Sequence, residues 1–144
     1  MKRQKSGFTL VELVVVVMIL GILAAVAAPR LLETSDTASE NGAKQTLAVI
    51  RDAIERHSAQ NAGALPGDAG TPADFIADLD PYLRGDSFPS CPVGNQNNQV
   101  SVQTVALTGP TGTQGWIYSN STGEFHINSN EQDSTVDNRP FFDY

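Results

Sequence analysis

The apolar segment near the N-terminus constrains the fold of this chain more than any other feature. Residues 8–28 form a run of 21 residues whose single charge is Glu12. At about 1.5 Å of rise per residue, a helix of this length matches a bilayer hydrocarbon core of about 30 Å. Lys2, Arg3 and Lys5 precede the run, and basic residues beside a span prefer the cytoplasmic side. We therefore expect a single membrane-spanning helix with a cytoplasmic N-terminus and an exported C-terminal part.

Glu12 is the residue of this span that needs an explanation. A carboxylate at the bilayer centre costs about 2.5–3.5 kcal/mol even on the lenient insertion scale, so an acid within a span indicates a functional position. Residues 7–13 read GFTLVEL behind the short basic leader. This pattern, with Gly21 and Pro29 further on, resembles the cleavage and methylation signature of type IV prepilins and of the pseudopilins of type II secretion.

The resemblance implies a role for each residue of the motif. In that family a prepilin peptidase cuts after the glycine matching Gly7 and methylates the amine of the phenylalanine matching Phe8. The hydrophobic helix is kept after cleavage. The carboxylate matching Glu12 neutralises the N-terminal amine of the same or a neighbouring subunit in a filament. The segment matching residues 21–29 can lose helical order on assembly.

The segment has two alternative interpretations. Ala25-Val26-Ala27 has the small-x-small form of a signal-peptidase site, so the segment can be read as a removable secretory signal. Its apolar region, however, exceeds the usual 7–15 residues and contains Glu12. An ordinary membrane anchor explains the length of the run but not the combination of Gly7, Phe8 and Glu12.

The chain is expected to have four parts. These are a basic leader (1–7), a transmembrane and filament-core helix (8–29), a neck with an amphipathic helix (30–60) and a small head (61–144). A continuous helix is expected from Phe8 to about Ser58, with a kink near Pro29, which lacks a backbone donor, and a second weak point at Gly21. The apolar face of its second half is marked by spacings of four, three and four: Ala43, Leu47, Ile50 and Ile54.

Charged residues on this second half are spaced for i,i+4 pairing. Each pair of opposite charge adds about 0.2–0.5 kcal/mol on an exposed face. The pairs are Glu40/Lys44, Arg51/Glu55 and Asp52/Arg56.

The head is expected to build a small antiparallel sheet. Thr71-Pro72 opens a short helix through about Leu79, because threonine caps helices and proline suits their first turn. Val100, Val102 and residues 105–107 indicate a first strand, and residues 116–118 and 125–127 bracket a turn as a hairpin. The fold class is therefore α+β and pilin-like, with the long helix packed on the sheet.

The composition of the chain argues against several classes of function. The chain carries a net charge of −7, and removal of residues 1–7 takes three of its nine Lys and Arg, giving 6 − 16 = −10. An acidic surface repels a phosphate backbone, so no nucleic acid is expected as a partner. Cys91 is the single cysteine, so the paired cysteines of many type IV pilins are absent, which favours a pseudopilin. With His57 and His126 the only histidines and no signature near Cys91, no enzymatic role and no catalytic residue are expected.

The acidic tail is a candidate metal site through the resemblance. Major pseudopilins hold a calcium ion in the loops after their sheet, and Glu131, Asp133 and Asp137 lie in the corresponding tail of this chain. Hard cations take clustered carboxylates and carbonyls. The sequence lacks the more specific loop motif of the family and the spacing of an EF-hand. The alternative, a solvated acidic tail with no cofactor, is favoured.

These observations predict a structural subunit of a pilus-like filament, in first place a pseudopilin of a type II secretion system. The alternatives are a type IV pilus or minor pilin subunit and, from another class, a membrane-anchored exported binding domain. The partners implied are copies of the chain and other pilin-like subunits, a prepilin peptidase, an inner-membrane assembly platform and membrane lipid. The implied location is the inner membrane, with the C-terminal domain in the periplasm.

Overall fold

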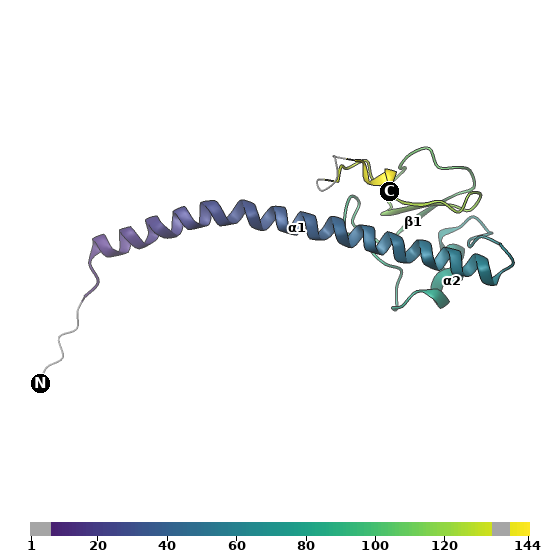
Figure 1. Cartoon of the computed structure of the whole chain (residues 1–144), viewed down its shortest axis with the longest axis horizontal. Coiled ribbons are helices and arrows are strands. Elements are labelled where there is room, and N and C mark those ends of the chain that lie inside the picture. Colours follow the sequence, from purple (N-terminus) through teal and green to yellow (C-terminus); the bar gives the residue numbers. More distant parts are fainter. Residues whose placement is uncertain (1–6, 134–138) are drawn as a thin grey trace, which may run out of the picture. The chain divides into compact units, whose positions relative to one another are not determined.

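The computed structural model describes residues 7–133 and 139–144, except for the side chains of residues 29–33. The elements follow the order α1 (Leu10–Gln60), α2 (Pro72–Leu79), η1 (Asp80–Tyr82), β1 (Val100–Gln103), β2 (Trp116–Ser119), β3 (Phe125–Ile127) and η2 (Phe141–Asp143) (Figure 1). Contacts divide the chain into two compact units, Met1–Asp36 and Thr37–Tyr144. The fold class is α+β and pilin-like, as predicted, while the four-part division remains a prediction.

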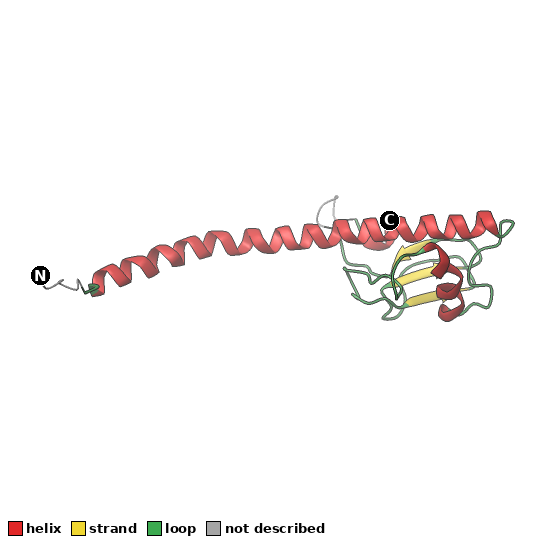
Figure 2. Ribbon diagram, turned by 90° about the horizontal axis from the view of Figure 1, so that it is seen from below, coloured by secondary structure: helices red, strands yellow, loops and turns green. Residues whose placement is uncertain are grey.

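The long helix is confirmed within two residues of its predicted ends. It continues through Gly21 and Pro29, and the kink expected there remains a prediction. Its second half buries the predicted apolar face, whose members are Ala43, Leu47, Ile50 and Ile54. In Figure 2 the strands and α2 lie on the same side of this half of α1. The amphipathic spacing therefore sets which face of the helix meets the head.

Aromatic rings fill the space between these elements. Phe75 of α2 lies with its ring centroid 4.2 Å from that of Tyr118 on β2 and 5.9 Å from that of Phe125 on β3. All three side chains are buried, and burial of each large apolar side chain stabilises a fold by about 1.5–3 kcal/mol. Leu79 is buried beside Phe75 on α2, and Thr71 Oγ1 accepts a hydrogen bond from the Asp74 amide at 3.3 Å. The predicted capped helix is thus confirmed.

The sheet is mixed, with the strand order β1-β2-β3. β2 and β3 pair antiparallel, which confirms the hairpin, but β1 and β2 pair parallel, with Val100 opposite Trp116. The expectation of a wholly antiparallel sheet was wrong for this pair. A parallel pair needs a crossover of about a dozen residues or more, and residues 104–115 supply it. The predicted strand at 105–107 does not form, and Val105 is exposed.

Two asparagines hold this crossover in place. The buried Asn128 side chain donates to the carbonyls of Thr111 and Gln114 at 2.6 and 2.9 Å and accepts from the Thr111 amide at 2.7 Å. Asn97 Oδ1 accepts from the Gly115 amide at 2.7 Å, and its Nδ2 donates to the Thr113 carbonyl at 2.8 Å. Residues 95–99, which are rich in Asn and Gln, form a loop. The Asn97 side chain in this loop supplies hydrogen bonds to backbone groups of the crossover that have no strand partner.

Of the predicted i,i+4 pairs on α1, one forms an ion pair and another is replaced by a contact with β3. Asp52 and Arg56 form the predicted ion pair, whereas Arg51 donates through Nε and Nη2 to the Phe125 carbonyl at 2.9 and 2.7 Å. Within the described residues no ion pair joins Arg51 to Glu55. His126 on β3 is half-buried, and its ring stacks on Phe142, with centroids 5.0 Å apart.

Candidate functional site

The start of α1 is a reciprocal cap between Thr9 and Glu12. The Thr9 hydroxyl and amide donate to Glu12 Oε2 at 2.7 and 2.9 Å, and the Glu12 amide donates to Thr9 Oγ1 at 3.2 Å. The Leu13 amide donates to the Thr9 carbonyl at 3.2 Å, which places Thr9 at the N-cap. This is the capping box that a threonine followed three residues later by glutamate forms at helix starts.

The cap gives Glu12 a second role beside the one that the family resemblance implies. The T-x-x-E spacing ahead of an apolar run is itself the sequence signal for such a cap. Hydrogen-bond donors of its own chain thus satisfy part of the carboxylate's bonding needs. In the uncleaved chain the Phe8 nitrogen belongs to a peptide bond and carries no charge. Pairing of Glu12 with a Phe8 amine therefore requires cleavage, and it remains a prediction.

The residues on either side of the predicted cut are exposed. A Cβ placed on Gly7 would meet no atom within 4 Å, and the Phe8 side chain is 78% exposed. A Cβ on Gly21 likewise meets nothing beyond its own helix. Neither glycine is required by packing within the part of the chain that the structure describes. A requirement for glycine at position 7 would therefore come from a molecule that acts on this segment.

The helix behind the cut is long and apolar enough to cross a membrane. The candidate span is Leu10–Ala28, and none of it is buried within the structure. Its large apolar side chains are exposed, among them Leu10, Met18 and Ile22 at 78%, 64% and 67%. An apolar surface of this extent is stable only when lipid or other apolar helices cover it.

The three acidic residues of the candidate calcium site have different surroundings. Asp133 is fully buried, forms an ion pair with Lys44, and accepts a hydrogen bond from Tyr144 Oη at 2.6 Å. Glu131 is exposed, and Asp137 lies outside the described residues. Among the residues that are described, no three His, Cys, Asp or Glu side chains gather as metal ligands. The described residues therefore do not fit a calcium site, because a lysine ammonium already contacts the buried carboxylate.

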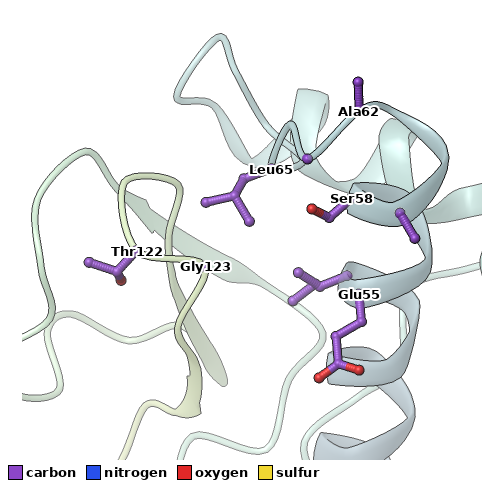
Figure 3. A pocket seen from close by; sticks show the side chains of 9 residues that line it. Glu55, Ser58, Ala62, Leu65, Thr122 and Gly123 are labelled. Carbon is purple, nitrogen blue, oxygen red and sulfur yellow. The ribbon is translucent and has the colours of Figure 1, made fainter.

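Cys91 and His57 are both buried in the head. Cys91 is buried as a free thiol, and burial raises its pKa, so the reactive thiolate is disfavoured. His57 is buried on α1 with its ring edge-on to Tyr82, at 5.9 Å between centroids. A hollow of about 550 Å³ lies between the end of α1 and the β2–β3 turn (Figure 3). Glu55 is the one ionisable side chain among its lining residues, so it offers no acid–base or nucleophilic pair.

The N-terminal motif, the exposed apolar helix and the small α+β head together define a class. A prepilin-type Gly-Phe junction followed by such a helix and head is the arrangement of a pilin-like, membrane-anchored subunit. The model of the prokaryotic N-terminal methylation motif matches residues 2–28. No solved structure matches the chain.

Curated relatives place the chain within this class. The type II secretion system core protein G of Vibrio cholerae is 30% identical over 128 residues, covering 78% of this chain and 88% of the relative. The chain belongs to the family of type II secretion system core protein G. The same-named protein of Pseudomonas aeruginosa is 43% identical over 60 residues, but this alignment spans only 42% of each chain. The type IV narrow pilus major component PilA5 of Thermus thermophilus is 40% identical over 58 residues, or 40% of this chain and 50% of the relative.

Proposed function

We propose that the chain is a structural subunit of a pseudopilus, the short filament of a type II secretion system, and is not an enzyme. The observation that carries the proposal is the exposed span Leu10–Ala28, capped by Thr9 and Glu12 and preceded by an accessible Gly7-Phe8 junction. An anchor alone needs the apolar surface but not a carboxylate within it. A filament subunit uses both, because the same apolar faces pack against neighbouring helices after the subunit leaves the membrane.

The subunit reaches the filament through a processed precursor. A prepilin peptidase cuts between Gly7 and Phe8 and methylates the new Phe8 amine. The basic leader keeps the N-terminus in the cytoplasm, so Thr37–Tyr144 stands on the periplasmic side of the inner membrane. The partners are membrane lipid, the inner-membrane assembly platform, copies of this chain and other pilin-like subunits, with no nucleic acid.

Glu12 then sets the register between subunits. Two opposite charges about 4 Å apart attract by about 4 kcal/mol at an effective dielectric of 20, whereas either charge alone is costly in apolar surroundings. The apolar faces of the helices hold neighbouring subunits together but do not fix how the subunits align along one another. Before assembly the Thr9 hydroxyl and amide hold the Glu12 carboxylate, and in the filament a Phe8 amine becomes its partner.

The mass of the mature N-terminal peptide tests this proposal directly. The expected peptide begins at N-methylated Phe8. A mature chain beginning at Ala28 would identify the segment as a removed secretory signal. An uncleaved chain would identify the protein as a membrane-anchored binding domain that does not polymerise.

A subunit of a type IV pilus is the second candidate, favoured by the 40% identity to the Thermus pilus component over 58 residues. Deletion of the gene separates the two candidates. A pseudopilin deletion leaves normally exported proteins trapped in the periplasm, whereas loss of a pilus subunit removes surface pili and leaves secretion intact.

A further inference from the structure

The carboxylate of Asp133 is buried in the head. It has no exposed surface, although it lies in the C-terminal tail beyond the sheet. A buried carboxylate remains charged only if it is paired and hydrogen-bonded, since burial of an isolated charge is prohibitively costly. The groups that surround Asp133 therefore decide how the tail is held.

Those groups come from α1 and from the end of the chain. The Lys44 ammonium forms an ion pair with Asp133 Oδ2, and Tyr144 Oη donates to the same oxygen at 2.6 Å. The Lys44 nitrogen also lies 4.9 Å from the centroid of the Tyr144 ring, a cation–π contact. Lysine, carboxylate and phenol thus form one cluster, which we call the tail cluster.

The tail cluster joins the C-terminal tail to α1. The Asp133 amide donates to the Arg139 carbonyl at 2.9 Å, and the Phe141 amide donates to the Glu131 carbonyl at 2.9 Å. Phe141 is buried in the core. These contacts fold the tail back on itself, while Lys44 joins it to α1.

Lys44 supplies the positive charge beside the Asp133 carboxylate that a bound metal ion would otherwise supply. A divalent cation bound to Asp133 would lie close to the ammonium, and like charges repel strongly where solvent is excluded. Burial lowers the pKa of Lys44. The hydrogen bond to Asp133 and the charge of Asp133 raise it by more than that, so the net shift is upward and the ammonium remains charged. A lysine fixed by the helix thus supplies permanently the charge that a bound ion would supply reversibly.

We propose that the Lys44 ammonium is the cation that holds the buried Asp133 carboxylate, so the tail packs onto α1 without a bound divalent metal. This differs from the calcium site that the family resemblance implies at Glu131, Asp133 and Asp137. It also stands independently of the filament role, because it concerns the folding of the head alone.

The test uses the full-length chain in detergent, with the fluorescence of Trp116 as the reporter of unfolding. Trp116 is the one tryptophan of the sequence and is fully buried. The thermal midpoint of the wild type is measured in chelator, in saturating calcium and in saturating magnesium. We expect the same midpoint in all three. A midpoint that falls in chelator and is restored by calcium overturns the proposal.

Variants then test whether Lys44 acts through its charge. Lys44→Met keeps most of the side-chain stem and should lower the midpoint by at least about 5 °C in every buffer. Arg56→Met is the matched control, because it removes a positive charge from an exposed ion pair on the same helix and should shift the midpoint by no more than about 2 °C. Equal midpoints for Lys44→Met and the wild type contradict the proposal.

The double variant Lys44→Met/Asp133→Asn separates charge from packing. It removes the unpaired carboxylate as well, so its midpoint should lie above that of Lys44→Met alone. A double variant no more stable than Lys44→Met would mean that the lysine stem, and not its charge, holds the tail. If Lys44→Met does not fold, the wild-type comparison in chelator and calcium still decides the question.

Discussion

Thr9 and Glu12 hold each other at the start of α1: the Thr9 hydroxyl lies 2.7 Å from Glu12 Oε2, and the Glu12 amide lies 3.2 Å from Thr9 Oγ1. The same carboxylate is thus a helix cap in the isolated chain and, by our proposal, the partner of an amine in the filament. These two roles make different demands on the side chain. A cap needs an acceptor, whereas pairing with an amine needs a negative charge.

Substitutions of Glu12 distinguish the two roles. Glu12→Gln keeps an acceptor for Thr9 but removes the charge, and Glu12→Ala removes both. Both variants should be inserted and cleaved normally, yet yield less than about a tenth of the wild-type filaments, since each tenfold loss corresponds to only about 1.4 kcal/mol and the lost ion pair exceeds that. Sheared filaments are quantified against total mature subunit.

Thr9→Val is the matched control for this experiment. It removes the hydroxyl of the cap and leaves the Glu12 charge, so it should assemble far more filament than Glu12→Gln. Wild-type amounts of filament from Glu12→Gln cells would leave capping as the role of Glu12 and remove the ion pair from the assembly scheme.

Gly7→Leu should stop processing without disturbing the fold. A side chain at position 7 has open space in this chain, so the head should keep the wild-type thermal midpoint. The precursor should nevertheless accumulate in the membrane, because a peptidase must approach the backbone at this position closely. Immunoblots report the ratio of precursor to mature chain. Gly21→Ala, which also meets open space, should be processed normally, and efficient cleavage of Gly7→Leu would argue against a glycine-dependent cut.

Gly115→Ala tests the tight crossover between β1 and β2. A Cβ at this position would lie 2.3 Å from the Asn97 carbonyl oxygen, so the crossover must shift. We expect a loss of about 1–3 kcal/mol in the free energy of unfolding, as for other overpacked sites. Chemical denaturation of the full-length chain in detergent, followed by Trp116 fluorescence, measures it.

Gly42→Ala is the matched glycine control. It lies inside α1, where an added Cβ would make an ordinary 3.9 Å contact with Pro92 Cγ. This variant should gain about 0.5–1 kcal/mol, because alanine loses less backbone freedom than glycine when a helix forms. Similar changes for the two variants would show that the crossover is looser than the structure indicates.

His126 should make the head less stable in mild acid. Burial lowers its pKa, and the Arg51 charge lowers it further, against the opposing effects of the Phe142 carbonyl, Glu124 and Asp143. A lowered pKa means that the folded state favours the neutral ring. Its contribution to stability is therefore present above the unfolded value of about 6.5 and is lost as the pH falls below it.

His126→Phe provides the comparison for this pH dependence. The phenyl ring can still stack on Phe142 but does not titrate, although it loses the 2.7 Å hydrogen bond that Nδ1 donates to the Phe142 carbonyl. The wild type should be the more stable protein at pH 7, and its advantage should shrink between about pH 6.5 and 5. A constant difference between the two thermal midpoints over this range would refute the titration of His126.

The sequence by itself determined the features that depend on local order. The length of the apolar run, the spacing of Ala43, Leu47, Ile50 and Ile54, the cap at Thr71 and the β2–β3 turn all act between residues close in the chain. Such features depend on helical and strand periodicity and on capping chemistry, so they can be read before any tertiary contact is known.

Only the tertiary structure decided the direction of β1, the position of His126 and the partner of Asp133. The parallel pairing of β1 and β2 depends on Asn97 and Asn128, whose amides bind loop backbone up to 18 residues away along the chain. Asp133 forms an ion pair with Lys44, which lies 89 positions earlier in the chain (133 − 44). Contacts of this kind leave no periodic signal in the sequence, because they form where the packing of the core brings distant polar groups together and burial then obliges them to pair.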